Sequence, residues 1–577
     1  MGHFTATLQS EGTLSTNYQN LYTFDNISIL FHGFIANVQE LCPIPKLDLS
    51  LPDSMRYAKA MLTAYRLWGN KLSQNVFGEY AVAIYNASNR SLLLAHDTLG
   101  IVPLYYYKNS NGIVFSSHMN GIVNRSSSFQ IDEEYIADYL CYGDHYGERT
   151  PFTEVKRLTP GISICYSNNT LTINKCWGIK DRHIRYSDTR DYEEHLRSLM
   201  QEAVETSLPT NGTTWCELSG GLDSSTVLCT AANLSKAQNL SALSLVYPES
   251  HLADEFEWIK PVLEKSGVPS YTLNVDSMKF FTALPTDFYA QPYHAMCNLA
   301  LYQSYGKLLK ENKVDVVLTG MGGDAVLLGD GPEPFFFADL LTKGHLLKLG
   351  KQLASWASLS KQRRPALYWL RQCTFTPVIR KLKNQLIQDY LPPHLPWLAA
   401  NYERGIKRSK LIRKSWVPAN NSISIADSWF LERIIRCSNI VSLWDYTYPM
   451  TAEFRHPLMY VPLIEFMCSI PWEVRLSPIV DRVLQRAAFK GILPDVITQR
   501  ETKAGPDQVI YKGLASGAQW LHLLSTKPVL VERGYIDPVQ WKQTIELAQL
   551  GRCTSIKHFI AAATLEAWLQ QLKGPLI

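Results

Sequence analysis

Short apolar runs separated by turn residues make up the first part of the chain. Each run has the length of a strand, and together they cover 27–31, 80–85, 91–95, 104–107 and 113–115. Helical periodicity interrupts them near 54–68 and 132–141. This pattern predicts a strand-rich α+β sandwich of packed sheets over residues 1–180.

The pattern changes after residue 209, where predicted strands alternate with predicted helices. Strands are expected at 214–218, 240–247, 270–274 and 314–319. Helices are expected between them, at 223–234, 252–266 and 295–312. This order predicts an α/β fold with a doubly wound parallel sheet, and such sheets bind ligands at the carboxyl ends of their strands.

The rest of the chain adds helices to this sheet. Residues 425–523 are expected to be mostly helical, and residues 331–424 form an insertion rich in Lys, Arg, Trp and Pro. We therefore expect two domains, 1–180 and 181–577. The basic side chains of the insertion form either a solvated helical surface or a docking face for an acidic partner.

Composition narrows the class of protein. The formal net charge of the 577 residues is +4, so charge alone indicates neither a nucleic-acid partner nor a membrane. The eleven cysteines are scattered without a Cys-x-x-Cys pair, which fits a reduced, cytoplasmic chain better than a disulfide framework or a zinc site. We also expect no signal peptide and no membrane span, because the N-terminus lacks a basic start and no apolar run is long enough.

One loop is rich in groups that hold phosphate. The predicted strand 214–218 ends at Leu218, and the chain continues through Ser219, Gly220, Gly221, Asp223, Ser224 and Ser225 into a predicted helix. Two glycines allow a tight turn and a close approach to a ligand, and three hydroxyls join the unpaired N–H groups of the helix start. No Lys follows the glycines, so this is not the P-loop of a kinase or GTPase. An acidic residue in such a loop would repel phosphate unless it held a cation, so Asp223 implies Mg²⁺.

A second loop has the same character. The predicted strand that ends near Leu318 continues into Thr319, Gly320, Gly322, Gly323 and Asp324. Two glycine-rich loops, each with one Asp, in one βα domain predict a single nucleotide site.

Both loops resemble the pyrophosphate loops of the asparagine synthetase superfamily, which cleaves ATP to AMP and pyrophosphate. The resemblance implies ATP and Mg²⁺ as cofactors, with Asp223 and Asp324 holding the metal against the triphosphate. It places Leu218 and Leu245 at adenine-lining positions, although either could equally belong to the core. It places Arg482 where the family has a phosphate-contacting Lys, although a solvated helix face is an equal alternative.

The first domain resembles the glutamine amidohydrolase domain of asparagine synthetases at 31–37, 78–85 and 95–105. Working members of that family carry a nucleophilic Cys after the initiator Met, and here that residue is Gly2. The glutamine-binding turn carries His32 and Phe34 where the family has Asn and an acidic residue. Glycine has no nucleophile and Phe cannot pair with an ammonium group, so we expect this domain to make no ammonia.

Two further candidates for catalysis lie near the end of the chain. Glu453 resembles a carboxylate that, in β-lactam-forming relatives, pairs with a Tyr to deprotonate the attacking amine, but Met321 takes the place of that Tyr. Glu453 is therefore either a base or substrate-orienting group, or a structural partner of Arg455. Lys503 resembles the family's Lys that stabilises charge as the amine attacks the acyl-adenylate.

Intact ATP loops beside a degenerate first domain favour enzymes that close a ring with an internal amine. Within the superfamily the chain is most like lasso peptide cyclases, through 320–324, 247–255 and the Pro-Trp-Leu stretch at 396–398. This implies a macrolactam synthetase that acts on a linear peptide, with a leader peptidase or leader-recognition protein as a candidate partner. The alternatives are a β-lactam synthetase-like cyclase, an ammonia-dependent asparagine synthetase, and a nucleotide-binding scaffold without activity.

Overall fold

The computed structural model describes most of the chain. The described residues are 3–16, 18, 21–42, 51–124, 129–143, 147–176, 183–234, 239–250, 253–329, 334–382, 395–400, 402, 423–447, 450–501, 507–553 and 555–573. Among them, no helix is long and apolar enough to cross a membrane.

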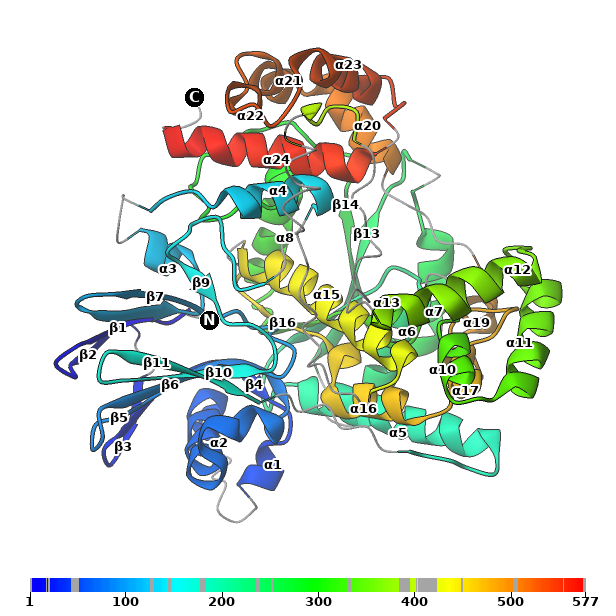
Figure 1. Cartoon of the computed structure of the whole chain (residues 1–577), viewed down its shortest axis with the longest axis horizontal. Coiled ribbons are helices and arrows are strands. Elements are labelled where there is room, and N and C mark those ends of the chain that lie inside the picture. Colours follow the sequence, from blue (N-terminus) through cyan, green and yellow to red (C-terminus); the bar gives the residue numbers. More distant parts are fainter. Residues whose placement is uncertain are drawn as a thin grey trace.

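Two antiparallel sheets form the N-terminal part (Figure 1). One sheet has the order β2 (Leu14–Thr16), β1 (Thr5–Gln9), β8 (Gly112–Ser116), β7 (Tyr105–Asn109), β9 (Lys156–Arg157). The other has the order β11 (Thr170–Lys175), β10 (Ile162–Ser167), β6 (Ser91–His96), β5 (Gly78–Asn86), β4 (Ile27–Ile35), β3 (Leu21–Phe24). All five apolar runs of the sequence overlap strands of these sheets.

Apolar side chains fill the space between the two sheets, among them Phe4, Leu94 and Phe115. The helix predicted near 54–68 is α2 (Asp53–Trp68), which packs on the outer side of β4. The helix predicted near 132–141 is α4 (Glu133–Tyr142), with Asp132 as its side-chain cap. Instead of covering a sheet, α4 packs against the long C-terminal helix α24 (Ile556–Lys573), so it links the two parts of the molecule.

A five-stranded parallel sheet forms the centre of the C-terminal part, which confirms the predicted parallel sheet. Its order is β14 (Ser270–Asn274), β13 (Leu240–Val246), β12 (Thr214–Glu217), β15 (Val316–Leu318), β16 (Glu453–Arg455). Its first flanking helices are α5 (Thr189–Ser207), α6 (Leu222–Ala232), α7 (Phe256–Ser266) and α8 (Leu299–Glu311). The strand order reverses between β12 and β15, and ligands of such sheets bind at that point.

Residues 425–523 are mostly helical, as predicted, but the edge strand β16 among them was not predicted. The helices there are α15 (Ile425–Thr447), α16 (Val461–Ser469), α17 (Trp472–Arg475), α18 (Val483–Ala488), α19 (Asp495–Gln499), α20 (Asp507–Ser516) and α21 (Ala518–Ser525). Between α15 and α16, three residues pair with β15. A strand of three residues is too short to show an alternating pattern, so its pairing depends on tertiary contacts.

The described part of the basic insertion is helical. It contains α10 (Phe336–Thr342), α11 (Leu346–Leu359), α12 (Ala366–Trp369), a π-helical turn (Leu370–Phe375) and α13 (Thr376–Leu382), on one side of the molecule in Figure 1. Phe337, Trp356 and Trp369 are buried and stack edge to face. These aromatic residues belong to the large apolar cluster that also contains Phe430 of α15, whereas basic side chains such as Lys343 and Lys351 are exposed.

The Pro-Trp-Leu stretch lies away from the two glycine loops. Trp397 is buried against Trp541 of α23 (Pro538–Gln549), and Leu398 forms a β-bridge with Ile536. The part of the insertion at 383–394 and 403–422 lies outside the described residues.

Candidate active site

The two glycine-rich loops meet where the strand order reverses. The first follows β12 and runs into α6, and the second follows β15 and runs into the short helix α9 (Gly323–Val326). A side chain at Gly320 would place its Cβ 2.7 Å from the amide nitrogen of Ser224, and one at Gly323 would overlap the carboxyl group of Asp223. The glycines of the second loop therefore allow it to pack directly on the first.

The first loop presents donors to an anion. Gly220 has φ +67°, and a Cβ there would lie 2.6 Å from Cβ of Trp258, so the turn needs glycine. The hydroxyls of Ser219 and Ser224 lie 3.2 Å apart, and the Ser224 hydroxyl also accepts from the Ser219 amide. Among the described residues, the buried Ser225 hydroxyl has no hydrogen-bond partner. Three hydroxyls at the N-terminus of α6 fit the phosphates of a nucleotide.

The structure brings Asp223 and Asp324 together. The Arg482 guanidinium forms ion pairs with both carboxylates, at 3.1 Å from Asp223. The Gln485 amide donates to the other oxygen of Asp223, at 3.2 Å. Two carboxylates that share one cation are close enough to share a divalent ion, so the oxygen ligands present fit Mg²⁺.

Other side chains hold the loops in place. Arg433 donates to the carbonyls of Asp324 and Gly329 at 2.8 and 2.9 Å. Arg500 donates to the Gly220 carbonyl at 2.9 Å and forms an ion pair with Glu255. Its guanidinium also lies 4.7 Å above the Trp258 ring.

The sequence analysis assigned no role to Arg433 and Gln485. Gln485 lies three residues after Arg482, one turn along α18, and this spacing indicates that the two side chains lie on the same face. Arg433 approaches from α15, far along the chain, and the sequence carries no signal for its contact.

The predicted adenine positions border the loops. Leu218 is 2% exposed, and its amide donates to the Leu243 carbonyl. Leu245 is half-buried near the end of β13.

In the second loop, Thr319 is buried, and its hydroxyl accepts from the Met321 amide at 3.2 Å. Gly322 has φ +89° and lies against Met459.

Glu453 lies apart from the loops. It forms a two-fold ion pair with Arg455, at 3.0 and 3.2 Å, and both side chains are buried. Its register partner in β15 is Val316, so Glu453 is at the amino edge of the sheet, whereas the loops leave at the carboxyl edge. Lys503 lies outside the described residues.

In the structure, the part of the first domain that resembles a glutamine site is occupied by phenylalanine and histidine side chains. Phe34 is 3% exposed, and the Arg455 guanidinium lies 4.3 Å from its ring. His3 lies beside His32 and His118, with ring centres 4.8 and 4.7 Å away. Burial lowers the pKa of His3 to about 2 and that of His32 to about 4, so both rings are neutral at pH 7. Gly2 lies outside the described residues.

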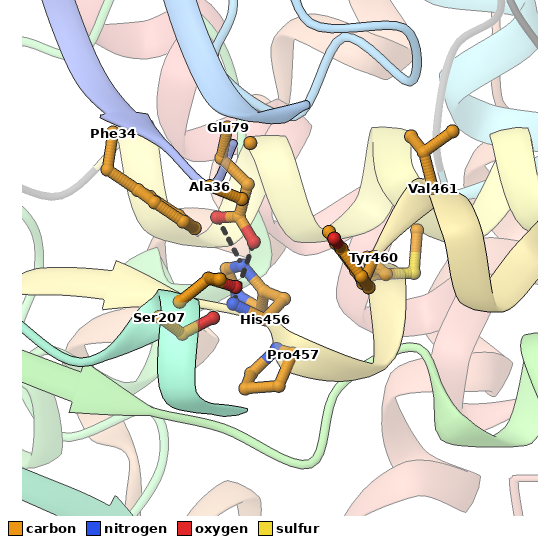
Figure 2. Close-up of a pocket in the computed structure, with 11 residues that line it drawn as sticks. Phe34, Ala36, Glu79, Ser207, His456, Pro457, Tyr460 and Val461 are labelled. Atoms are coloured by element: carbon orange, nitrogen blue, oxygen red, sulfur yellow. Dashed lines mark hydrogen bonds and ion pairs between the residues drawn. The ribbon is translucent and has the colours of Figure 1, made fainter. Parts of the chain in front are cut away.

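The two domains are joined beside this position. Figure 2 shows Glu79 of β5 pointing at His456, which follows β16. The carboxylate accepts from the His456 amide at 2.7 Å and from its Nδ1 at 3.0 Å. The small hollow around this pair is also lined by Phe34, Ser207 and Tyr460.

Comparison with known proteins shows to which family the chain belongs. A family model described as asparagine synthase matches residues 195–570, and one described as a glutamine amidotransferase domain matches residues 16–177. The chain therefore belongs to the asparagine synthase family and has the architecture of an ATP-dependent, amidotransferase-like ligase.

Individual relatives are distant. "Asparagine synthetase [glutamine-hydrolyzing] 3" of Bacillus subtilis is 21% identical over 547 residues, which covers 91% of this chain and 83% of the relative. "Amidase chyE" of Penicillium rubens is 25% identical over 305 residues, which covers 49% of this chain and 44% of the relative. Among solved structures, glutamine phosphoribosylpyrophosphate amidotransferase from B. subtilis has a TM-score of 0.21 and 10% identity over 56% of this chain and 70% of its own.

Proposed function

We propose that this chain is a lasso peptide cyclase, an AMP-forming ligase that closes a macrolactam ring in a linear peptide. The observation that carries the proposal is the contrast between the two domains. Arg482 pairs with both Asp223 and Asp324 where the two glycine-rich loops meet, whereas the position of the glutamine nucleophile is Gly2. Phe34, packed under Arg455, also cannot supply the carboxylate that pairs with the ammonium group of glutamine.

The first step is adenylation of a peptide carboxylate. A side-chain Asp or Glu of the peptide attacks the α-phosphorus of ATP, the bond to the β-phosphate breaks, and pyrophosphate leaves. The hydroxyls of Ser219, Ser224 and Ser225 and the N-terminus of α6 hold the phosphates in place. Asp223 and Asp324 would hold Mg²⁺, which would supply positive charge to offset that of the departing pyrophosphate.

The second step forms the amide. The N-terminal amine of the same peptide attacks the acyl-adenylate, loses a proton and displaces AMP, so the product is one water lighter than the peptide. A pre-folded peptide presents the amine to the acyl group, and such positioning contributes about 7–11 kcal/mol in well-oriented systems. We assign stabilisation of the developing charge to Lys503 and a structural role to Glu453, because Glu453 is bound to Arg455.

A second candidate is an ammonia-dependent asparagine synthetase. The relative named asparagine synthetase favours this candidate, because its match spans both domains of the chain. A β-lactam synthetase-like cyclase would use the same loops on a smaller substrate. The three candidates share adenylation and differ in the carboxylate that is activated and in the amine that attacks it.

The test is AMP and pyrophosphate release from Mg-ATP by the full chain, with product masses. The peptides carry an N-terminal Gly and an Asp or Glu seven to nine residues further on, and aspartate with ammonia is the comparison. We expect AMP release with a peptide that has lost one water. AMP release with asparagine as product would contradict the proposal and support the second candidate.

A further inference from the structure

Arg482 occupies the position between the two carboxylates that the proposed function assigns to Mg²⁺. Its guanidinium pairs with Asp223 and Asp324 at once, although these residues come from different loops. The Arg482 side chain is 10% exposed and that of Asp223 is 12% exposed, so water screens their pairing poorly. One guanidinium therefore neutralises much of the charge that would attract a metal ion.

The surroundings are shaped to hold the guanidinium there. A Cβ at Gly329 would overlap both the Arg482 guanidinium and the Asp324 carboxylate, so the ends of these two side chains pack directly on the Gly329 backbone. Arg482 itself has φ +51°, a conformation that is uncommon outside glycine, and it directly precedes α18. Arg433 fixes the backbone on the other side, through the carbonyls of Asp324 and Gly329.

We propose that Arg482 is an internal counter-cation, which keeps the carboxylate pair closed to free divalent ions and is displaced when the metal arrives with the nucleotide. Two carboxylates without a cation would repel each other, which would destabilise the empty loops. A metal ion must therefore compete with a guanidinium that is already bound. A metal ion with a triphosphate offers the guanidinium a new anionic partner, so Arg482 exchanges the carboxylates for phosphate oxygens.

Three consequences follow for the full chain without nucleotide. Divalent ions alone bind weakly to the wild type. Removal of the guanidinium makes their binding tighter, because the competitor is gone. Removal also lowers the melting temperature of the empty protein, and a divalent ion restores it because the ion replaces the lost positive charge.

The experiment measures Mn²⁺ binding by calorimetry or electron paramagnetic resonance, in the absence of nucleotide. We expect Arg482→Gln to bind Mn²⁺ at least fivefold more tightly than the wild type, within the usual range of coupling between sites. Arg482→Lys should lie in between, since an ammonium reaches one carboxylate rather than two; this variant also serves if the Gln variant does not fold. The matched control is Lys490→Gln, an exposed residue just beyond α18 with the same charge change, which should bind Mn²⁺ as the wild type does.

The outcomes separate this inference from the proposed function on which it rests. Equal Mn²⁺ affinity in the wild type and in both Arg482 variants would overturn the counter-cation role. Loss of the tighter binding on addition of Asp223→Asn to Arg482→Gln would assign the bound ion to the carboxylate pair. Tighter binding that survives Asp223→Asn would place the ion elsewhere and overturn the inference. No measurement involves a peptide, aspartate or ammonia, so a different acceptor amine would leave these results unchanged.

Discussion

At the scale of single residues, Asp223 carries the largest share of the proposed chemistry. It lies in the first turn of α6, contacts Arg482 and Gln485, and packs against Gly323 of the second loop. Asp223→Asn keeps the size of the side chain and removes the charge that we propose holds Mg²⁺. We expect AMP formation to fall by about two orders of magnitude or more, whichever acceptor is supplied.

The control for this prediction is Asp315→Asn. Asp315 is exposed at the amino edge of the same sheet, where it accepts from the Thr213 amide, and an Asn oxygen can do the same. AMP release and the melting temperature of this variant should match the wild type. Wild-type turnover in Asp223→Asn would remove the metal role from that residue.

The burial of His96 predicts how the free energy of unfolding depends on pH. His96 is fully buried, its ring nitrogens face the carbonyls of Asp97 and Leu158, and burial lowers its pKa to about 4. The unfolded chain binds a proton near pH 6.5 and the folded chain does not, so stability is lost as the pH falls from 6.5 towards 4. This group contributes a slope of about 1.4 kcal/mol per pH unit in that window.

The adjacent Asp97 acts in the opposite direction. Burial raises its pKa to about 7, despite the four backbone amides that bind its carboxylate, so stability is lost as the pH rises from about 4 to 7. The two slopes partly cancel in the wild type. His96→Gln should therefore be relatively more stable at pH 5 than at pH 7, when denaturation midpoints are compared with the wild type. An unchanged ratio would mean that the pKa of His96 is the same in the folded and the unfolded chain.

The arrangement of the residues within the two loops could be predicted because it depends on short spacings along the chain. Each loop presents glycines, hydroxyls and one Asp within a few positions, and short spacing fixes their geometry. Arg433 and the burial of Phe34 under Arg455 could not be predicted, because those partners come from distant segments. For Glu453 the sequence left two alternatives open, a catalytic group or a structural partner of Arg455, and the buried ion pair with Arg455 favours the second.

At the scale of elements, the contact between the two loops depends on glycine. A Cβ at Gly320 would meet the Ser224 backbone at 2.7 Å, and a backbone atom cannot give way as a side-chain end can. Gly320→Ala should separate the loops, raise the KM for ATP at least tenfold and lower the melting temperature. Gly350→Ala in α11 is the control, because a Cβ there meets nothing within 4 Å and alanine favours a helix.

The control variant should be as stable as the wild type or slightly more so. An ATP affinity of Gly320→Ala equal to that of the control would show that the loops do not need close contact. The predicted strands and helices around these loops were confirmed because their apolar periodicity is long and regular. The strand β16 was not predicted, because its pairing with β15 depends on tertiary position rather than on a sequence pattern.

At the scale of the whole molecule, the first domain is attached firmly to the second. Glu79 binds the backbone and ring of His456, Arg157 donates to the Ser442 hydroxyl at 3.0 Å, and Ser438 donates to the Leu99 carbonyl at 2.9 Å. All these groups are buried. We infer that the first domain acts as a brace for β16 and the helices around it.

Glu79→Gln tests this brace. One carboxylate oxygen becomes an NH₂ group that faces an N–H donor, at a cost of about 1–3 kcal/mol for the lost bond. In calorimetry we expect both domains to melt together at a lower temperature. The control is the exposed Glu11→Gln, which should leave the thermogram unchanged. A shift in one transition alone, with the other unmoved, would show that the contact does not couple the domains.

The position of β16 has a consequence for biosynthesis. Val316, Val317 and Leu318 form a buried strand whose outer neighbour is encoded only at Glu453. At translation rates of roughly 5–20 residues per second, the ribosome needs on the order of ten seconds to deliver that neighbour. During this interval the nascent sheet has an open apolar edge, which is a template for pairing with other chains. A nascent chain arrested before residue 453 is therefore the form of this protein most in need of a chaperone.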